Sequence, residues 1–140
     1  MTITGGCLCG AVRYLAGGDV IAGLHCHCRD CQRSSGTGHV PVMVMPKALF
    51  QVQGETRSFA TTGSSGLKAI RNFCPVCGSL LFGTPEMAPE IVTIYVGSLD
   101  DPSVFDADFS QFVRYRHDWD RIAASIPEYH MVPVEEAEPH

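Results

Sequence analysis

Seven cysteines, gathered into three short clusters, constrain this chain more than any other feature of its sequence. The clusters are Cys7-Leu8-Cys9, Cys26-His27-Cys28-Arg29-Asp30-Cys31 and Cys74-Pro75-Val76-Cys77. An odd number of cysteines leaves at least one outside any disulfide framework. Residues 1–9 carry neither the basic segment nor the apolar segment of a secretion signal, so we expect a cytoplasmic setting in which thiols stay reduced. Metal binding or catalysis therefore has to explain the cysteines.

The first and last clusters have spacings that suit a shared metal ion. In an extended chain, side chains two residues apart project to the same face, so Cys7 and Cys9 can reach one ion. The two-residue gap between Cys74 and Cys77, followed by Gly78, is typical of a zinc knuckle. A redox pair is less favoured there, because the surrounding sequence lacks the βαβ pattern of thioredoxin-like folds.

The middle cluster offers three thiols of its own. Cys26 and Cys28 share a face if the strand that starts near Asp19 continues, and Cys31 can return to the same ion from the following turn. Seven thiols then divide into four, which close a tetrahedral structural site, and three, which leave one position for water or substrate. We therefore predict one structural zinc and one open zinc per chain.

Spacing alone leaves other assignments open. The clusters could mix, for example with Cys7 joining the middle set. Alternatively, both sites could be structural, with His25, His27 or His39 in the fourth position. In an extended strand the first two histidines would point away from the neighbouring sulfurs, so we interpret them as packing groups or as groups that orient the ligands.

The chain has a size and composition that predict one domain with a true core. It has 140 residues, of which 45% are hydrophobic and 18% charged. We predict a single zinc-binding domain over residues 1–131 and an acidic, proline-containing, flexible tail over 132–140.

Hydrophobic periodicity predicts a mainly β fold. Apolar residues alternate over 12–14, 40–44 and 92–96, which indicates half-buried strands. Helical signal is weak and is limited to short turns at Arg29 to Ser34 and Asp118 to Ala124.

Charge and hydropathy exclude two classes of partner. The formal net charge of −5 argues against general nucleic-acid binding, which needs a basic face. The apolar stretches 40–45 and 91–96 are far shorter than the roughly 18 residues of a membrane span, so we expect no membrane partner. Four cations nevertheless lie near cysteines and could steer an anionic substrate: Arg29, Arg33, Lys68 and Arg71.

Three ordered motifs resemble the glutathione-dependent formaldehyde-activating enzyme family, which includes centromere protein V. The motifs are Gly6-Cys7-Leu8-Cys9-Gly10-Ala11-Val12-Arg13-Tyr14, Cys26-His27-Cys28-Arg29-Asp30-Cys31-Gln32 and Phe73-Cys74-Pro75-Val76-Cys77-Gly78-Ser79-Leu80-Leu81. The segment from Phe50 to Gly54, together with Trp119 and Ile126-Pro127, extends the resemblance over most of the chain. It implies an Mss4-like zinc-binding fold of short antiparallel strands with one or two helical turns.

The resemblance also implies the roles of the cysteines and the reaction. Cys7, Cys9, Cys74 and Cys77 would bind the structural zinc, and Cys26, Cys28 and Cys31 would bind the catalytic zinc. The activity would be that of a carbon–sulfur lyase, the reversible addition of the glutathione thiol to formaldehyde that gives S-hydroxymethylglutathione. No motif identifies a glutathione-binding residue.

The donor set of the open site favours thiol chemistry. Three thiolates on Zn²⁺ leave a formal charge of −1, so this ion should acidify water less than one held by neutral histidines. A substrate thiol could take the fourth position and stay nucleophilic as a thiolate. Polarisation of the carbonyl oxygen by the metal is the other mechanism that fits. A different class of function, a zinc-stabilised interaction module without turnover, also fits the fold.

Overall fold

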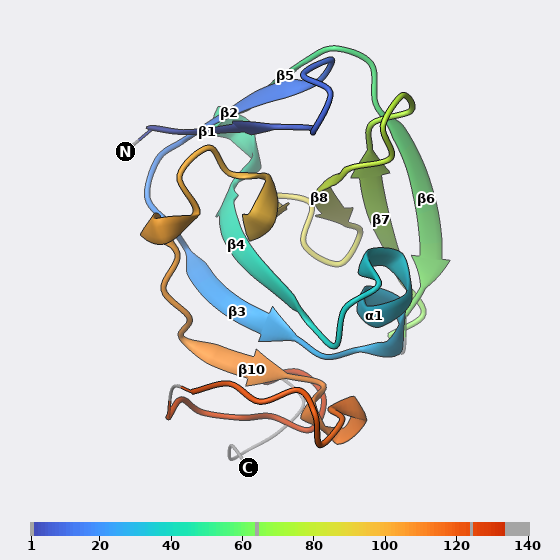
Figure 1. The fold of residues 1–140 in the computed structure, drawn as a ribbon, viewed down its shortest axis with the longest axis vertical. Helices are drawn as coiled ribbons and strands as arrows, with labels where there is room; N and C mark the ends of the chain where they lie inside the picture. Colours follow the sequence, from blue (N-terminus) through green and yellow to red (C-terminus); the bar gives the residue numbers. More distant parts are fainter. Residues whose placement is uncertain (1, 64, 124, 134–140) are drawn as a thin grey trace.

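The computed structural model describes residues 2–63, 65–123 and 125–133, and within them the strands form two sheets (Figure 1). The smaller sheet has the order β1-β2-β5, with β1 at Thr2–Gly6, β2 at Arg13–Gly17 and β5 at Phe50–Gln53. The larger sheet has the order β10-β3-β4-β9-β8-β7-β6. Its strands are β3 (Ala22–Cys26), β4 (Val40–Pro46), β6 (Arg57–Thr62), β7 (Lys68–Phe73), β8 (Leu80–Pro85), β9 (Ile91–Tyr95) and β10 (Phe109–Gln111).

The mainly β prediction is confirmed, because helical structure is sparse in the described residues. The α-helix there is α1 (Arg29–Ser35), and short 3-10 turns are η1 (Lys47–Leu49), η2 (Val96–Ser98), η3 (Pro102–Val104) and η4 (Val113–Tyr115). Pairing is antiparallel except between β10 and β3, which run parallel. The expectation of antiparallel strands therefore holds for all but this edge of the sheet.

Strand β4 contributes side chains to both hydrophobic core clusters. Met43 and Met45 lie in a core cluster that unites residues of both sheets, while Val42 and Val44 lie in a second cluster with two of the middle-cluster cysteines. The sequence pattern predicted a strand here with one buried face. The strand is confirmed, but the prediction that only one of its faces is buried is wrong. β4 lies between β3 and β9, and core clusters cover both of its faces, so the apolar side chains on both faces of the strand are buried.

The first predicted helical turn is confirmed and the second is wrong. α1 spans Arg29–Ser35, whereas residues 118–123 form only turns and bends, and 124 is outside the described residues. A helix this short is marginal by itself, so tertiary contacts decide the conformation. Asp120 illustrates the point: its main-chain N–H bonds the His117 carbonyl in a turn, and its carboxylate contacts His39, which is 81 residues away in sequence.

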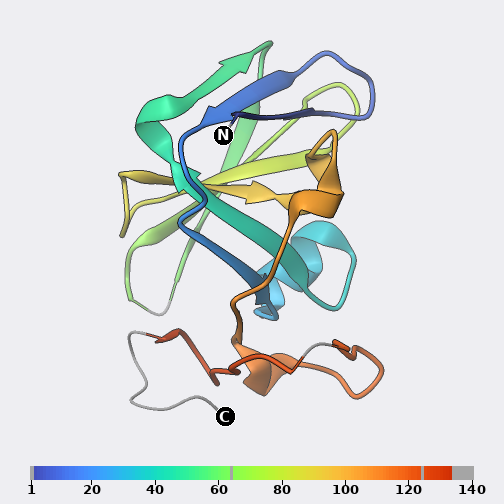
Figure 2. The same ribbon diagram turned by 90° about the vertical axis from the view of Figure 1, so that its left-hand side faces the viewer.

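The last described segment folds back along β10 (Figures 1 and 2). Ser110 and Glu128 form a parallel bridge, and the Phe112 N–H donates to the Met131 carbonyl at 2.7 Å. This packing places the segment on the edge of β10 that faces away from β3. Of the tail predicted over 132–140, positions 134–140 lie outside the described residues. Over the described ranges, no helix has the length and apolar character needed to cross a membrane.

Candidate metal centres and the adjoining cavity

The sulfurs of the first and last clusters meet in one four-thiol group, formed by Cys7, Cys9, Cys74 and Cys77, whose Sγ atoms all lie within 4.8 Å of one another. The Cys7–Cys9 distance is 3.6 Å and the Cys9–Cys74 distance is 3.7 Å. Four sulfurs in tetrahedral positions about 2.3 Å from a zinc ion would lie about 3.8 Å apart. The group therefore fits a zinc ion with little rearrangement.

Tight turns hold each pair of sulfurs in this group. The backbone φ angles of Gly10 and Gly78 are 81° and 76°, a left-handed conformation that glycine adopts without strain. Main-chain N–H groups point at the sulfurs, as Val12 does toward Cys7 Sγ at 3.2 Å. A hydrogen bond with the Ser79 hydroxyl lowers the pKa of Cys77 to about 5. These contacts favour the thiolate forms that a metal needs.

The middle cluster forms a separate three-thiol group of Cys26, Cys28 and Cys31. Cys26 ends β3, Cys28 caps the N-terminus of α1, and Cys31 lies in the first turn of the helix. The Sγ atoms of Cys26 and Cys31 are 3.4 Å apart, and the Cys31 N–H donates to Cys28 Sγ at 3.2 Å. Hydrogen bonds from Cys26 and Cys31 lower the pKa of Cys28 to about 3. The donor set and spacing fit a metal ion held by three thiolates.

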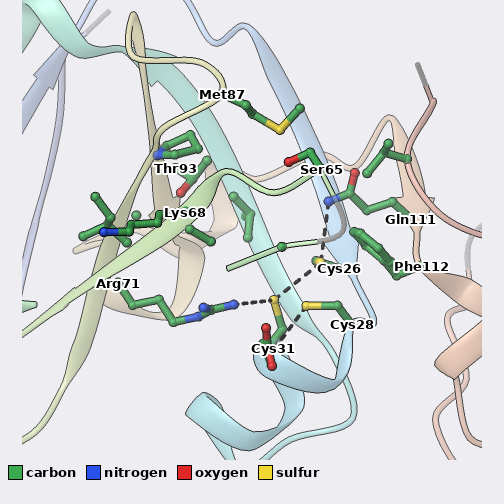
Figure 3. A pocket seen from close by; sticks show the side chains of 18 of the residues that line it. Cys26, Cys28, Cys31, Ser65, Lys68, Arg71, Met87, Thr93, Gln111 and Phe112 are labelled. Atoms are coloured by element: carbon green, nitrogen blue, oxygen red, sulfur yellow. Dashed lines mark hydrogen bonds between the residues drawn. The ribbon is translucent and has the colours of Figure 1, made fainter. Parts of the chain in front are cut away.

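Two polar side chains approach this group from strands that are distant in sequence (Figure 3). The Arg71 guanidinium, on β7, lies 3.7 Å from Cys31 Sγ and also donates to the Thr61 hydroxyl at 3.0 Å. Gln111, at the end of β10, donates its amide N–H to Cys26 Sγ at 3.5 Å. Both groups stabilise negative charge on sulfur, since a donor beside a thiolate favours the ionised form.

A cavity of about 460 Å³ opens beside the three-thiol group. Its walls are mostly apolar and include Leu24, Val42, Ile70, Met87 and Phe112, with Thr93 and Tyr95 among the polar groups. A volume of this size is typical of small-molecule sites, which lie between about 300 and 1,000 Å³. All three thiols of the group line the cavity, so a molecule inside it can reach them.

The four cations that lie near cysteines in the sequence differ in their position relative to the cavity. Arg29, Lys68 and Arg71 line the cavity, whereas Arg33 lies on the exposed face of α1 and does not. The sequence did not indicate a role for Gln111, because this residue lies 85 positions from Cys26 in a segment without cysteines. Only the pairing of β10 with β3 brings it to the sulfurs.

Gln32 is a second functional residue whose role the sequence did not indicate. Its buried amide donates to the main-chain carbonyls of His27 at 2.8 Å and Tyr115 at 3.1 Å, and His117 bonds its side-chain oxygen at 3.0 Å. These bonds tie α1 to the segment that follows β10. The helix that carries Cys31 is thereby held against the cavity wall.

Among the described residues, no histidine joins the three-thiol group. His27 and His39 instead cluster with Asp120, and neither lines the cavity. The alternative in which a histidine completes the second thiol site therefore finds no support in the geometry. Burial and the neighbouring His39 lower the pKa of His27 to about 4, so its imidazole is neutral at physiological pH.

Comparisons with known proteins give a family match and a similar fold. The sequence profile of the family described as glutathione-dependent formaldehyde-activating enzyme matches residues 2–115. The crystal structure of a Rhodobacter sphaeroides protein superposes with a TM-score of 0.56 over 74% of this chain and 96% of that one, at 20% sequence identity. At that identity the likeness is one of fold. The family match spans the whole of both thiol groups.

Proposed function

This chain belongs to the glutathione-dependent formaldehyde-activating enzyme family, and from this premise we propose that it is a zinc-dependent carbon–sulfur lyase. It would catalyse the reversible addition of a thiol to formaldehyde or a similar small electrophile. The observation that carries the proposal is that three convergent thiols form part of the wall of a cavity large enough for a small molecule. A purely structural metal site has no need of such a cavity.

We assign two zinc ions to the two thiol groups. Cys7, Cys9, Cys74 and Cys77 would hold the structural ion, because four thiolates complete its coordination. Cys26, Cys28 and Cys31 would hold the second ion and leave one position free toward the cavity. When bound, that ion supplies a position at which a substrate thiol loses its proton readily. Residues 1–131 would form a single domain around both sites.

The side chains around the three-thiol group set its charge. Three thiolates with one divalent cation carry a formal charge of −1, and Arg71 beside Cys31 brings the total close to zero. Gln111 adds a neutral donor at Cys26. These contacts hold the sulfurs in place and limit the cost of burying them, because a buried charge needs a partner.

The reaction requires that the thiol and the carbonyl be held together and that one proton pass from the sulfur to the oxygen. The substrate sulfur forms a bond to the carbonyl carbon, the π electrons move to the oxygen, and that oxygen takes up the proton lost by the thiol. The mostly apolar wall excludes water, and it holds the two reactants close together. Breakdown of the adduct follows the same steps in reverse.

Glutathione is the thiol that the family description suggests, and the cations of the cavity suit an anionic thiol. Lys68 and Arg29 line the cavity with Arg71, although the chain as a whole is acidic. Among the described lining residues, Asp30 supplies the one carboxylate, so cations outnumber anions there. A carboxylate-bearing thiol entering beside the three-thiol group would be attracted by these side chains.

The test is exchange spectroscopy of a thiol–formaldehyde adduct by NMR with zinc-loaded protein. We expect the protein to speed exchange in both directions without moving the equilibrium, and Cys28→Ser to lose the effect. Because the uncatalysed reaction is appreciable, a protein-free blank is subtracted. Equal rates for the wild type and Cys28→Ser with glutathione, cysteine and coenzyme A would leave the non-catalytic interaction module as the better account.

A pair of arginine variants separates a local effect from a general charge effect. Arg71→Met removes the cation beside Cys31, whereas Arg33→Met makes the same charge change outside the cavity. A charged hydrogen bond contributes about 1.5–3 kcal/mol, so we expect a roughly tenfold to hundredfold loss of kcat/KM in the first variant only. A similar loss in both would contradict a specific role for Arg71.

A further inference from the structure

A second group of metal-ligating side chains lies outside the cavity. It consists of His27, which follows β3, His39, which precedes β4, and Asp120 from the turn near the end of the described chain. One donor atom from each lies within 4.8 Å of the other two. The register of the sheet explains the pairing of the histidines. Cys26 pairs with Val40 at the end of the β3–β4 ladder, so the residues one step beyond them lie side by side.

The distances within this group suit coordination of one ion. His39 Nδ1 lies 2.8 Å from both carboxylate oxygens of Asp120, and His27 Nδ1 lies 3.4 Å from Oδ2. Nitrogen and oxygen ligands about 2.0–2.2 Å from a metal lie about 2.9–3.6 Å from one another, depending on the coordination geometry. Little movement is needed to place an ion between the three side chains.

His27 lacks the partners that a buried imidazole normally has. Its side chain is 0% exposed, and neither ring nitrogen has a hydrogen-bond partner among the described residues. Leaving such a group unpaired costs about 1–3 kcal/mol. A structural His39–Asp120 hydrogen bond accounts for those two residues but leaves His27 without a hydrogen bond, with only the 3.4 Å contact of its Nδ1 with Asp120 Oδ2. A metal ion would give all three side chains a partner.

The carboxylate of Asp120 is also placed for this role. It is nearly buried, and among the described side chains its oxygens lie close to the Nδ1 atoms of His27 and His39. A Cβ atom on Gly38 would lie 2.6 Å from Asp120 Oδ2, so the glycine leaves room for the carboxylate to reach the histidines. Asp120 also borders a polar depression of about 500 Å³.

We propose that His27, His39 and Asp120 form a third metal site, which binds a divalent first-row transition metal ion through two imidazole nitrogens and a carboxylate oxygen. This donor set is harder than the thiolate groups and accepts Zn²⁺, Co²⁺ or Fe²⁺. The bound ion would fasten the turn that carries Asp120 to the ends of β3 and β4. The proposal does not depend on the proposed activity.

The test counts metal ions and identifies their ligands. Protein loaded with only two equivalents of zinc per chain, enough to fill the thiol sites, is titrated with Co²⁺ and analysed by native mass spectrometry and absorption spectroscopy. We expect one additional Co²⁺ per chain, with d–d bands but without the sulfur-to-cobalt charge-transfer band in the near ultraviolet. Asp120→Asn should lose this ion and keep both zinc ions. A wild-type protein that takes up no Co²⁺ beyond the thiol sites would overturn the proposal.

A matched histidine variant and a measurement on the wild type complete the test. His25→Gln alters a ring whose centroid lies 4.8 Å from that of His39 but which is outside the three-ligand group, so this variant should keep the third ion. Loss of the third ion in His25→Gln, or retention of the third ion in Asp120→Asn, would refute the assignment of His27, His39 and Asp120 as its ligands. If Asp120→Asn does not fold, the 15N chemical shifts of the histidine ring nitrogens in the wild-type protein test the site instead. Added Zn²⁺ should move those of His27 and His39, and unmoved shifts would refute the site.

Discussion

The two thiol groups should differ in what they contribute to stability, and paired serine variants measure the difference. Cys74→Ser removes a ligand from the four-thiol group, whereas Cys28→Ser removes one from the three-thiol group. A metal in the first group joins Cys9 to Cys74 across 65 positions, while the second joins Cys26 to Cys31 across five. Metal binding that closes a longer loop removes more entropy from the unfolded chain.

The magnitude follows from these two separations. Because the entropy of loop closure scales as (3/2)RT ln n, the longer loop contributes about 2 kcal/mol more than the shorter one. In a domain near this size, 1 kcal/mol moves Tm by roughly 3 °C, so loop closure alone should separate the variants by roughly 6 °C. Cys74 is also fully buried in the main core, which adds to the loss in Cys74→Ser.

The assay is thermal unfolding of zinc-loaded proteins, with the zinc content measured on the same samples. We expect Cys28→Ser to lose one zinc and keep most of its stability, and Cys74→Ser to unfold at a clearly lower temperature or to aggregate. Val76→Ser is the matched control, because Val76 lies in the same knuckle but is 76% exposed and carries no thiol. Equal losses of Tm in both cysteine variants would refute the division into structural and open sites.

Three further variants test contacts away from the sulfurs. Gln32→Leu should leave the main-chain carbonyls of His27 and Tyr115 without the amide donor and, because His27 is buried, lower the free energy of unfolding in urea by about 1–3 kcal/mol; no change would show that water replaces the amide. The Arg13 guanidinium lowers the pKa of Asp100 to about 2, below its usual 3.8, so the pair stabilises the fold above pH 4 and loses that contribution as the pH falls toward 2. The stability difference between wild type and Asp100→Asn should therefore shrink over that interval, and a constant difference would contradict the assignment. Gly38→Ala should displace Asp120 and lower stability by about 1–3 kcal/mol, whereas an unchanged Tm would mean that the turn shifts freely.

Much of the candidate site could be predicted because it is encoded locally. Two sulfurs separated by one or two residues must lie near each other in any turn or strand, so the clusters themselves were visible in the sequence. The short helix at Arg29–Ser35 gave only a weak signal in the sequence, over Arg29 to Ser34, because so short a helix depends on tertiary contacts. Alternation of apolar residues predicted the mainly β fold, and the three motifs indicated the family.

What the sequence alone did not determine depends on pairing between distant strands. Arg71 and Gln111 approach the sulfurs because β7 and β10 occupy particular places in the larger sheet, and Asp120 meets His39 because a turn packs there in place of a helix. These positions follow from the total burial of apolar surface, to which every strand contributes, and no short segment carries that information. The sequence thus indicated which cysteines could bind a metal, and only the tertiary structure decided which cations, amides and carboxylates surround them.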